Sequence, residues 1–232
     1  MEVAGRSADP NARPVLEAVD LYRFYHAADD DETLALRGVS LAILPGEVVA
    51  VVGPSGSGKS TLLACLCGLD DPDGGAVRVG GERMSRRPES ERADLRARSI
   101  GVVMQSGNLL EHLSVLENVE LAQALTRDRS RSPRDVLASV GLAGRAASAP
   151  SRLSGGEAAR AGLAVALAGA PSVLLADEPT GEVDAANEHA ITQLLLAEAA
   201  RGTAVLVVTH SDRLAAAATR IIRLLDGAII DE

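Results

Sequence analysis

Lysine and aromatic residues are nearly absent from this chain. Among 232 residues there is one lysine, Lys59, against 22 arginines, and Phe, Trp and Tyr together make up 1% of the sequence. The core must therefore be built from Ala, Val, Leu and Ile, which dominate the 47% hydrophobic fraction. A chain of this length buries a sizeable core, and we expect one domain with a helical lobe.

Basic residues are also fewer than acidic residues, 23 against 32. The formal net charge is −9 and the sequence pI is near 5.0. These values argue against a nucleic-acid partner, because a phosphate backbone needs a broad basic face. A net negative charge does not exclude a small basic pocket.

Long apolar runs are missing as well. No run approaches the roughly 20 residues needed to cross a bilayer. The first 14 residues are polar or small and include Asp9 and Pro10, unlike a signal peptide. We expect residues 1–14 to be a disordered tail and residues 15–232 to form the domain.

The few cysteines and histidines do not have metal-site spacing. Cys65 and Cys67 are two residues apart on an expected helix, so they point away from each other, and we interpret them as small core residues in a reducing cytoplasm. His26, His112 and His189 lack carboxylate or cysteine partners at ligand spacing and are expected on the surface.

The single lysine lies in a glycine-rich segment that fits G-x-x-x-x-G-K-[ST], a loop whose backbone N–H groups surround nucleotide phosphates. The apolar run at 47–52 predicts a strand before it, and Thr61–Leu69 predicts a helix whose positive N-terminus faces the phosphates. A glycine-rich turn can match this pattern by chance, but strand, loop and helix in this order favour phosphate binding. The residues expected to contact the nucleotide here are Gly53, Ser55, Gly56, Ser57, Gly58, Lys59, Ser60 and Thr61.

The order of predicted elements indicates an α/β fold. Val15–Tyr25 and Thr33–Ile43 predict an N-terminal antiparallel β subdomain, joined by an acidic turn at 29–32. Later buried strands alternate with helices, which predicts a parallel or mixed sheet with flanking helices. Together with the phosphate loop, this order indicates a P-loop NTPase core. The signals between about 106 and 165 are helical and predict an inserted α-helical subdomain.

Two adjacent carboxylates end the apolar strand Val173–Ala176. Asp177 and Glu178 leave the strand in different directions, because strand side chains alternate. Asp177 suits Mg²⁺ binding together with Ser60, and Glu178 suits activation of a water. Most Asp-Glu pairs are surface charges, but the phosphate loop in the same chain favours a functional pair.

A second candidate anion site begins the next helix, at Leu153–Glu157. Ser154 and Glu157 form a capping-box pattern, and Gly155 and Gly156 leave backbone N–H groups accessible. An ordinary capped helix would also explain this segment taken alone. Two phosphate-binding helix starts on separate lobes predict a head-to-tail pair of chains, in which each second start closes over the partner's nucleotide.

Taken together, these motifs resemble those of the ATP-binding-cassette (ABC) ATPases, and the resemblance covers nearly the whole chain from about residue 15. Six motifs occur in the order of that family, which is far more specific than any one motif. They are the phosphate loop Gly53–Thr61, the Q-loop residue Gln105, the signature Leu153–Glu157, the second nucleotide motif Val173–Glu178, the D-loop Gly181–Asp184 and the switch histidine His210.

The resemblance implies a role for each matching residue. Tyr25 is expected to stack on adenine, with Tyr22 and Phe24 as competing assignments. Further expected roles are magnesium binding by Ser60, Gln105 and Asp177, catalysis by Lys59, Gln105, Glu178 and His210, and contacts from a second copy by Ser154, Gly155, Gly156 and Asp184.

Within the family, the chain looks like the subgroup of lipoprotein-release and macrolide-export (LolD/MacB-type) ATPases. That implies a homodimer that binds and hydrolyses MgATP and drives a separate integral membrane permease of export or mechanotransmission type, from the cytoplasmic face of the plasma membrane. The alternatives are a soluble ABC ATPase of DNA repair or translation, and a nucleotide kinase or GTPase. A soluble ABC ATPase of that kind typically carries a coiled-coil insertion, a zinc module or two cassettes. A nucleotide kinase or GTPase leaves the signature Leu153–Glu157 unexplained.

The chain departs from the family pattern at Ala158, Val165, Glu182–Val183 and Glu111. None of these positions is an expected ligand of phosphate or magnesium. ATP hydrolysis therefore stays the expectation, and the departures bear on its rate and on signalling between subunits.

Overall fold

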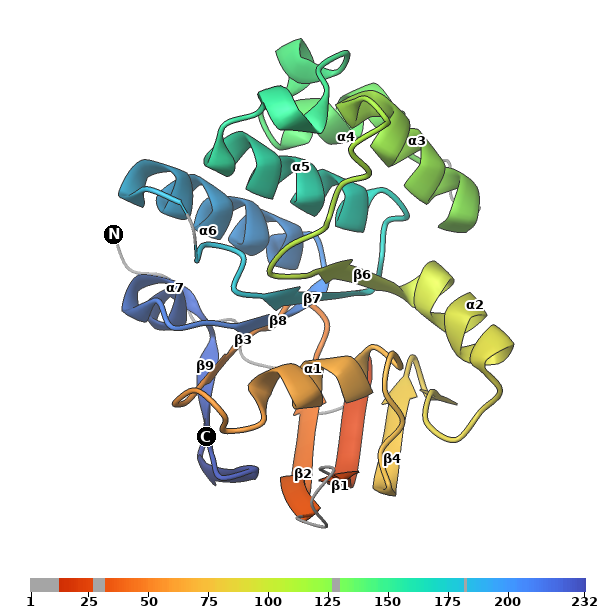
Figure 1. Cartoon of the computed structure of the whole chain (residues 1–232), viewed down its shortest axis with the longest axis vertical. Helices are drawn as coiled ribbons and strands as arrows, with labels where there is room; N and C mark the ends of the chain where they lie inside the picture. The colour runs from red at the N-terminus through yellow and green to blue at the C-terminus, as the bar shows by residue number, and fades with distance from the viewer. Residues whose placement is uncertain (1–12, 27–31, 127–129, 182) are drawn as a thin grey trace.

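The computed structural model describes residues 13–26, 32–126, 130–181 and 183–232. Most of the expected disordered tail, most of the acidic turn at 29–32, and Glu182 of the D-loop lie outside these residues. The described chain forms two sheets and a layer of helices that extends to one end of the molecule (Figure 1).

The larger sheet of the described residues has six strands in the order β10-β9-β3-β8-β7-β6. Its pairings are parallel except for β9 with β10, so the predicted mixed sheet is confirmed. Alternate residues of β3 enter different cores, Val49 and Val51 on one face and Val48 and Ala50 on the other. The strands are β3 (Val48–Val52), β6 (Ile100–Val103), β7 (Val173–Asp177), β8 (Ala204–Val208), β9 (Arg220–Leu225) and β10 (Ala228–Asp231).

The smaller sheet is antiparallel, with the order β2-β1-β4-β5 among the described residues. This confirms the predicted N-terminal antiparallel pair. Its strands are β1 (Leu16–His26), β2 (Glu32–Ile43), β4 (Gly74–Val79) and β5 (Glu82–Arg83).

Helix α1 (Lys59–Leu66) joins the two sheets. Leu62, Leu63 and Leu66 belong to one hydrophobic cluster with Leu16 of β1 and Val49 of β3. Figure 1 shows α1 beside both sheets, directly after the loop that leaves β3. The helix that follows the glycine-rich loop is therefore fixed by packing on both sides.

The helical segment packs around its own small core, in which Val115, Val119, Val136, Leu137 and Ala161 are buried. Figure 1 shows these helices stacked over the large sheet. They are α3 (Val115–Thr126), α4 (Pro133–Ser139), the short 3₁₀ turns η1 (Ala143–Arg145) and η2 (Pro150–Arg152), and α5 (Gly155–Leu167); α6 (Ala185–Ala200) and α7 (Asp212–Ala217) lie against the sheet itself.

The structure adds elements that the sequence analysis did not assign. These are α2 (Glu89–Ser99), in which Leu95 alone is buried, and the α7–β9–β10 segment after His210. Helix α1 starts at Lys59, two residues before the predicted start. Cys65 and Cys67 are buried as predicted, and burial raises the pKa of the Cys65 thiol to about 12. None of the described helices is long and apolar enough to cross a bilayer.

Gly101 of β6 lies tightly against α5, which gives the first testable prediction. A Cβ at this position would lie 2.3 Å from the Ala166 carbonyl oxygen. We expect Gly101→Ala to lower the free energy of unfolding by about 1–3 kcal/mol, as overpacked cores do. The matched control is Gly144→Ala in η1, where a Cβ meets nothing within 4 Å. Chemical denaturation of both variants compares them; equal stability would contradict the close packing of β6 on α5.

Candidate functional site

Parallel pairing brings the predicted site residues to one edge of the large sheet. Val51 of β3 pairs with Val208 of β8, and Val208 also pairs with Asp177 of β7. The chain leaves these strands into the glycine-rich loop, toward His210, and into Glu178. The carboxyl edge of a parallel sheet is where α/β proteins place ligand sites.

A cavity of about 660 Å³ opens at this edge. It is lined from β1, β2, α1, β7, β8 and the turn between β9 and β10, so segments far apart in sequence meet there. Of the residues predicted from sequence, those that line it are Tyr25, Ser55, Gly56, Gly58, Lys59, Ser60, Thr61, Gln105, Asp177, Glu178 and His210.

Two predicted loop residues do not line the cavity but shape the loop behind it. A Cβ on Gly53 would lie 2.1 Å from the Leu224 carbonyl oxygen, so only glycine fits against β9. Ser57 is 2% exposed, and its carbonyl accepts a hydrogen bond from the Gly227 N–H at 3.0 Å. Both residues hold the loop against the β9–β10 hairpin.

The start of α1 is open to an anion. Gly58 precedes the helix with φ +100°, a left-handed conformation that suits glycine, and no side chain caps the helix. The first turn carries no acidic residue. Helix-start N–H groups have no partner within the helix, so this end offers free donors and a positive dipole to a phosphate.

The only lysine is held by the loop itself. The Lys59 Nζ donates hydrogen bonds to the carbonyls of Gly53 at 2.8 Å and Pro54 at 2.9 Å. The residue is 7% exposed. Its compact ammonium therefore lies within the loop, in the wall of the cavity.

The two carboxylates after β7 are placed differently. Asp177 is 7% exposed and lines the cavity. Glu178 has φ +48°, a left-handed value that is uncommon outside glycine and is often found at functional sites. Its backbone N–H donates to the Val208 carbonyl at 2.9 Å, which fixes the turn.

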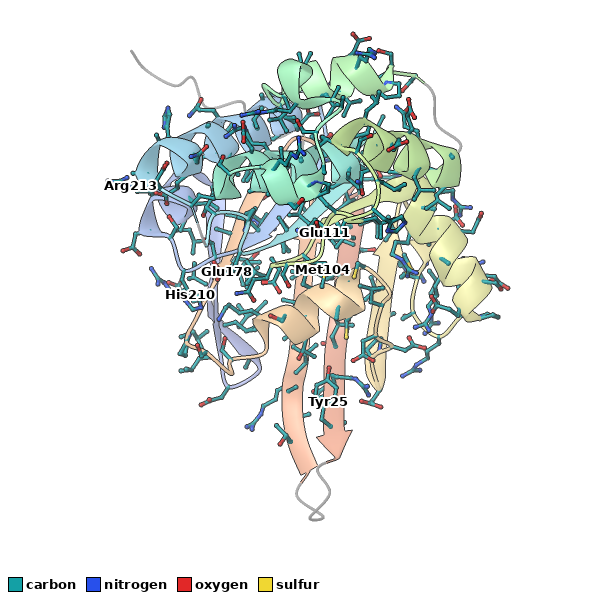
Figure 2. All side chains as sticks on the ribbon, turned by 45° about the horizontal axis from the view of Figure 1, so that its top comes forward. Tyr25, Met104, Glu111, Glu178, His210 and Arg213 are labelled. Atoms are coloured by element: carbon teal, nitrogen blue, oxygen red, sulfur yellow. The ribbon has the colours of Figure 1, made fainter. Side chains whose placement is uncertain are left out.

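Glu178 and His210 face each other, as Figure 2 shows. The His210 backbone N–H donates to Glu178 Oε2 at 3.2 Å, and His210 Nε2 lies 3.6 Å from Glu178 Oε1. That Oε1 atom is buried and has no hydrogen-bond partner. A buried carboxylate oxygen without a partner is costly, so this atom is suited to accept a hydrogen bond from bound water.

Gln105 is exposed and lies between two cavities. It lines the 660 Å³ cavity and also an adjacent groove of about 260 Å³. Glu111, Ala158 and Val183, which depart from the family pattern, line that groove. Figure 2 shows Met104 and Glu111 on the same side of the molecule as Glu178.

The structure separates the three aromatic candidates for base stacking. Tyr25 lines the cavity, whereas Tyr22 and Phe24 do not. The Tyr22 ring packs where side chains on Gly38 and Gly74 would otherwise stand. Tyr25 is the residue of the three that a base in the cavity can reach.

The predicted second anion site stands apart from this cavity. Ser154 caps α5: its Oγ accepts from the Glu157 N–H at 3.3 Å, and the Glu157 carboxylate accepts from the Ser154 N–H at 2.9 Å. The predicted capping box is confirmed. The Ser154 N–H and Arg145 lower the pKa of Glu157. Ser154 and Gly155 are exposed.

Helices α5 and α6 meet through Asn187. A Cβ on Gly156 would lie 2.1 Å from Asn187 Cγ, so this glycine is required for close helix packing. Asp184 caps α6 by accepting from the Asn187 N–H at 2.8 Å, and this bond lowers the pKa of Asp184. Ser154, Gly155, Gly156 and Asp184 thus form one group that does not line the phosphate-loop cavity. Gly155 lines the adjacent groove, together with Gln105 and Glu178.

Sequence reasoning missed several lining residues. The β9–β10 turn contributes Asp226 and Gly227, and the Asp-Gly pair between two apolar runs is a hairpin signal that could have revealed it. Thr33 and Arg37 of β2 also line the cavity, and no motif in the sequence marks them. Among the described residues, no three His, Cys, Asp or Glu side chains gather as a metal cluster.

Comparison with known proteins gives consistent matches. The family model of ABC transporters matches residues 36–181. The chain is 42% identical over 228 residues to the macrolide export ATP-binding/permease protein MacB of Burkholderia thailandensis, covering 95% of this chain and 34% of the relative. It is 41% identical over 227 residues to the lipoprotein-releasing system ATP-binding protein LolD of Ruegeria pomeroyi, covering 95% and 99%.

A solved structure matches with a TM-score of 0.86 and 34% identity, covering 93% of this chain and 97% of the other. It is a dimeric ATP-binding cassette in a post-hydrolysis state, bound to ADP and Pi. The chain spans about a third of the length of the MacB relatives that it matches. The chain belongs to the ABC transporter family, as an ATPase cassette similar to those of MacB and LolD.

Proposed function

We propose that two copies of this chain bind two ATP molecules head to tail, each nucleotide lying between the phosphate loop of one copy and the start of α5 of the other. The observation that carries this proposal is that the start of α5 does not line the phosphate-loop cavity of its own chain. A dimeric cassette among the similar solved structures supports it.

Within each composite site, the phosphates bind at Lys59 and the open start of α1, and the base lies on Tyr25. The second copy supplies Ser154, Gly155 and Gly156 to the γ-phosphate, with Asp184 beside them. The overall charge of the chain is −9, so the buried Lys59 and the helix dipole carry the attraction for ATP.

The residues present fit Mg²⁺. Ser60, Gln105 and Asp177 line one cavity and offer a hydroxyl, an amide and a carboxylate oxygen. Magnesium favours oxygen ligands and is usually held by one or two carboxylates together with phosphates and water. When bound, the ion would neutralise charge on the β- and γ-phosphates.

For hydrolysis, the Glu178 carboxylate accepts a proton from the attacking water. The water oxygen bonds to the γ-phosphorus while the bond to the β-phosphate oxygen breaks, which releases ADP and phosphate. His210, whose Nε2 lies 3.6 Å from Glu178 Oε1, holds the γ-phosphate beside that carboxylate. Catalysis is then mainly positioning and charge stabilisation in a cavity closed by the second copy.

The partner that uses this ATPase is an integral membrane permease, for export or mechanotransmission, and the chain works at the cytoplasmic face of the plasma membrane. The names of the similar proteins, a macrolide export ATP-binding/permease protein and a lipoprotein-releasing system ATP-binding protein, support a permease partner. The docking surface lies at Gln105 and the segment 106–113 that follows it, part of which lines the 260 Å³ groove.

The role of Glu178 is tested by Glu178→Gln. The amide keeps the shape of the side chain and cannot accept the proton, so ATP binding should persist while turnover falls by about 100-fold or more. Nucleotide-bound dimers should accumulate on size-exclusion chromatography. Turnover near that of the unsubstituted protein would remove Glu178 from this role.

The composite site is tested by mixing two inactive variants. Ser154→Arg blocks the second anion site, and Lys59→Ala disables the phosphate loop. A heterodimer of the two retains one intact site, so the mixture should recover ATPase activity that neither variant has alone. The control is each variant at the same total concentration. A mixture as inactive as its components, with both folded, would count against the head-to-tail arrangement.

The fit of the lysine is tested by Lys59→Arg. The ammonium lies between two carbonyls at 2.8 and 2.9 Å in a buried position, where a planar guanidinium with its fixed fork does not fit. Displacement of the γ-phosphate by about 1 Å should cost about 100-fold in turnover. The exposed Arg134→Lys is the matched control and should be unaffected. Turnover of Lys59→Arg close to that of this control would show that the site does not require an ammonium.

A further inference from the structure

One face of the Tyr25 ring is covered by an arginine. The guanidinium carbon of Arg23 lies 4.7 Å from the ring centroid. Tyr25 lines the 660 Å³ cavity and Arg23 does not. The ring therefore meets the cavity, and the cation lies over the ring without lining the cavity.

Asp70 is hydrogen-bonded to both residues, and we call Arg23, Tyr25 and Asp70 together the triangle. The Asp70 Oδ2 atom accepts the Tyr25 hydroxyl at 2.8 Å and Arg23 Nε at 2.8 Å. One carboxylate oxygen thus fixes both the position of the ring's hydroxyl end and the guanidinium that covers its face. Stacking of an arginine plane on an aromatic ring adds a cation–π attraction.

The triangle is tied to both elements that frame the cavity. Asp70 follows α1, and its backbone N–H donates to the Ala64 carbonyl at 3.1 Å. Arg23 Nη1 also donates to Asp73 Oδ2 at 3.0 Å, and the Phe24 N–H donates to the same oxygen at 2.8 Å. The ring of Tyr25 is thereby held relative to the helix that carries the phosphate loop.

The charges in the triangle persist at neutral pH. Burial acts to raise the pKa of Asp70, but hydrogen bonds from Arg23 and Tyr25 lower it overall. Burial, together with Asp70, raises the pKa of the Tyr25 phenol. The carboxylate is therefore ionised and the phenol keeps the proton that it donates.

We propose that Arg23 and Asp70 are positioning residues for the base of the nucleotide, which they serve by fixing the Tyr25 ring with one face covered and the other turned to the cavity. This inference rests on the proposed nucleotide site. It adds that the distance between the stacked base and the phosphate loop is set by the Arg23–Asp70 pair.

A purely structural ion pair between β1 and the segment after α1 predicts something different. Loss of such a pair would lower stability and leave nucleotide affinity unchanged, or weaken every phosphate ligand equally. A positioning role predicts a loss that depends on the base. The two are separated by comparing ATP with inorganic triphosphate, which carries the phosphates and no base.

The experiment measures dissociation constants of both ligands for the unsubstituted chain, Arg23→Met and Asp70→Ala. The control is Asp94→Ala, which removes the exposed Asp94–Arg98 ion pair of α2, 3.0 Å long and outside the cavity lining. We expect the affinity for ATP to fall about tenfold in both test variants, because base–aromatic stacking contributes on that scale. The affinity for triphosphate should not change, and the control should match the unsubstituted chain with both ligands.

Kinetics and spectroscopy give independent readouts. The KM for ATP should rise in the test variants while kcat at saturating ATP is kept. The chain has two tyrosines and no tryptophan, so Tyr22→Phe leaves Tyr25 as the only tyrosine emitter. ATP should change that emission, triphosphate should not, and adding Asp70→Ala should reduce the response to ATP.

Unchanged ATP affinity in folded test variants, or equal losses for ATP and triphosphate, would overturn the inference while leaving the proposed function in place. An unsubstituted chain that binds no ATP would overturn both. Should the test variants not fold, Tyr25→Phe decides, because it keeps the ring and the Arg23–Asp70 ion pair and removes the hydroxyl that donates to Asp70. Its ATP affinity must then fall relative to its triphosphate affinity, and an equal ratio would refute the proposal.

Discussion

The parallel pairing of β3, β8 and β7 is the constraint on which the rest of the site depends. Val51, Val208 and Asp177 lie in one row across these strands. The row brings the phosphate loop and the carboxylates to the same sheet edge, although more than a hundred residues separate them in sequence. A shift of β7 by one residue would turn Asp177 to the opposite face of the sheet. The buried aliphatic residues that fix the strand register therefore also fix the position of this carboxylate.

The two helix starts that this fold provides are not equivalent. The α1 start has no side-chain cap, and its free donors face the cavity. The α5 start is already capped by Ser154 and Glu157, and it is locked onto α6 by Gly156 against Asn187. One start is uncapped at the cavity, and the other is capped and packed against a neighbouring helix. In the composite site that we propose, each start comes from a different copy, and a single chain is half of that unit.

Much of this could be predicted from the sequence, because the informative residues are local. The glycine-rich loop, the acids after an apolar strand and the Ser154 capping box each depend on neighbours a few residues away, and the structure contains all three. Other features depend on distant pairing. Nothing in the run from Tyr22 to Tyr25 tells which ring meets the cavity, because that is decided by how β1 pairs with β2 and β4. Arg37 lines the cavity because of where β2 lies in the fold, and no local sequence pattern predicts that position.

The strongest test of the account asks whether the two helix starts meet only between copies. Cys65 and Cys67 are 1% and 0% exposed, so introduced cysteines would be the accessible ones among the described residues. We would place Ser55→Cys in one copy and Gly155→Cys in another, mix them, and measure cross-linking by a short bifunctional thiol reagent. If the two helix starts meet between copies, a cross-linked pair of chains should form with ATP and not without it. A cross-link that joins both positions within a single chain carrying both substitutions, and none between chains, would contradict it.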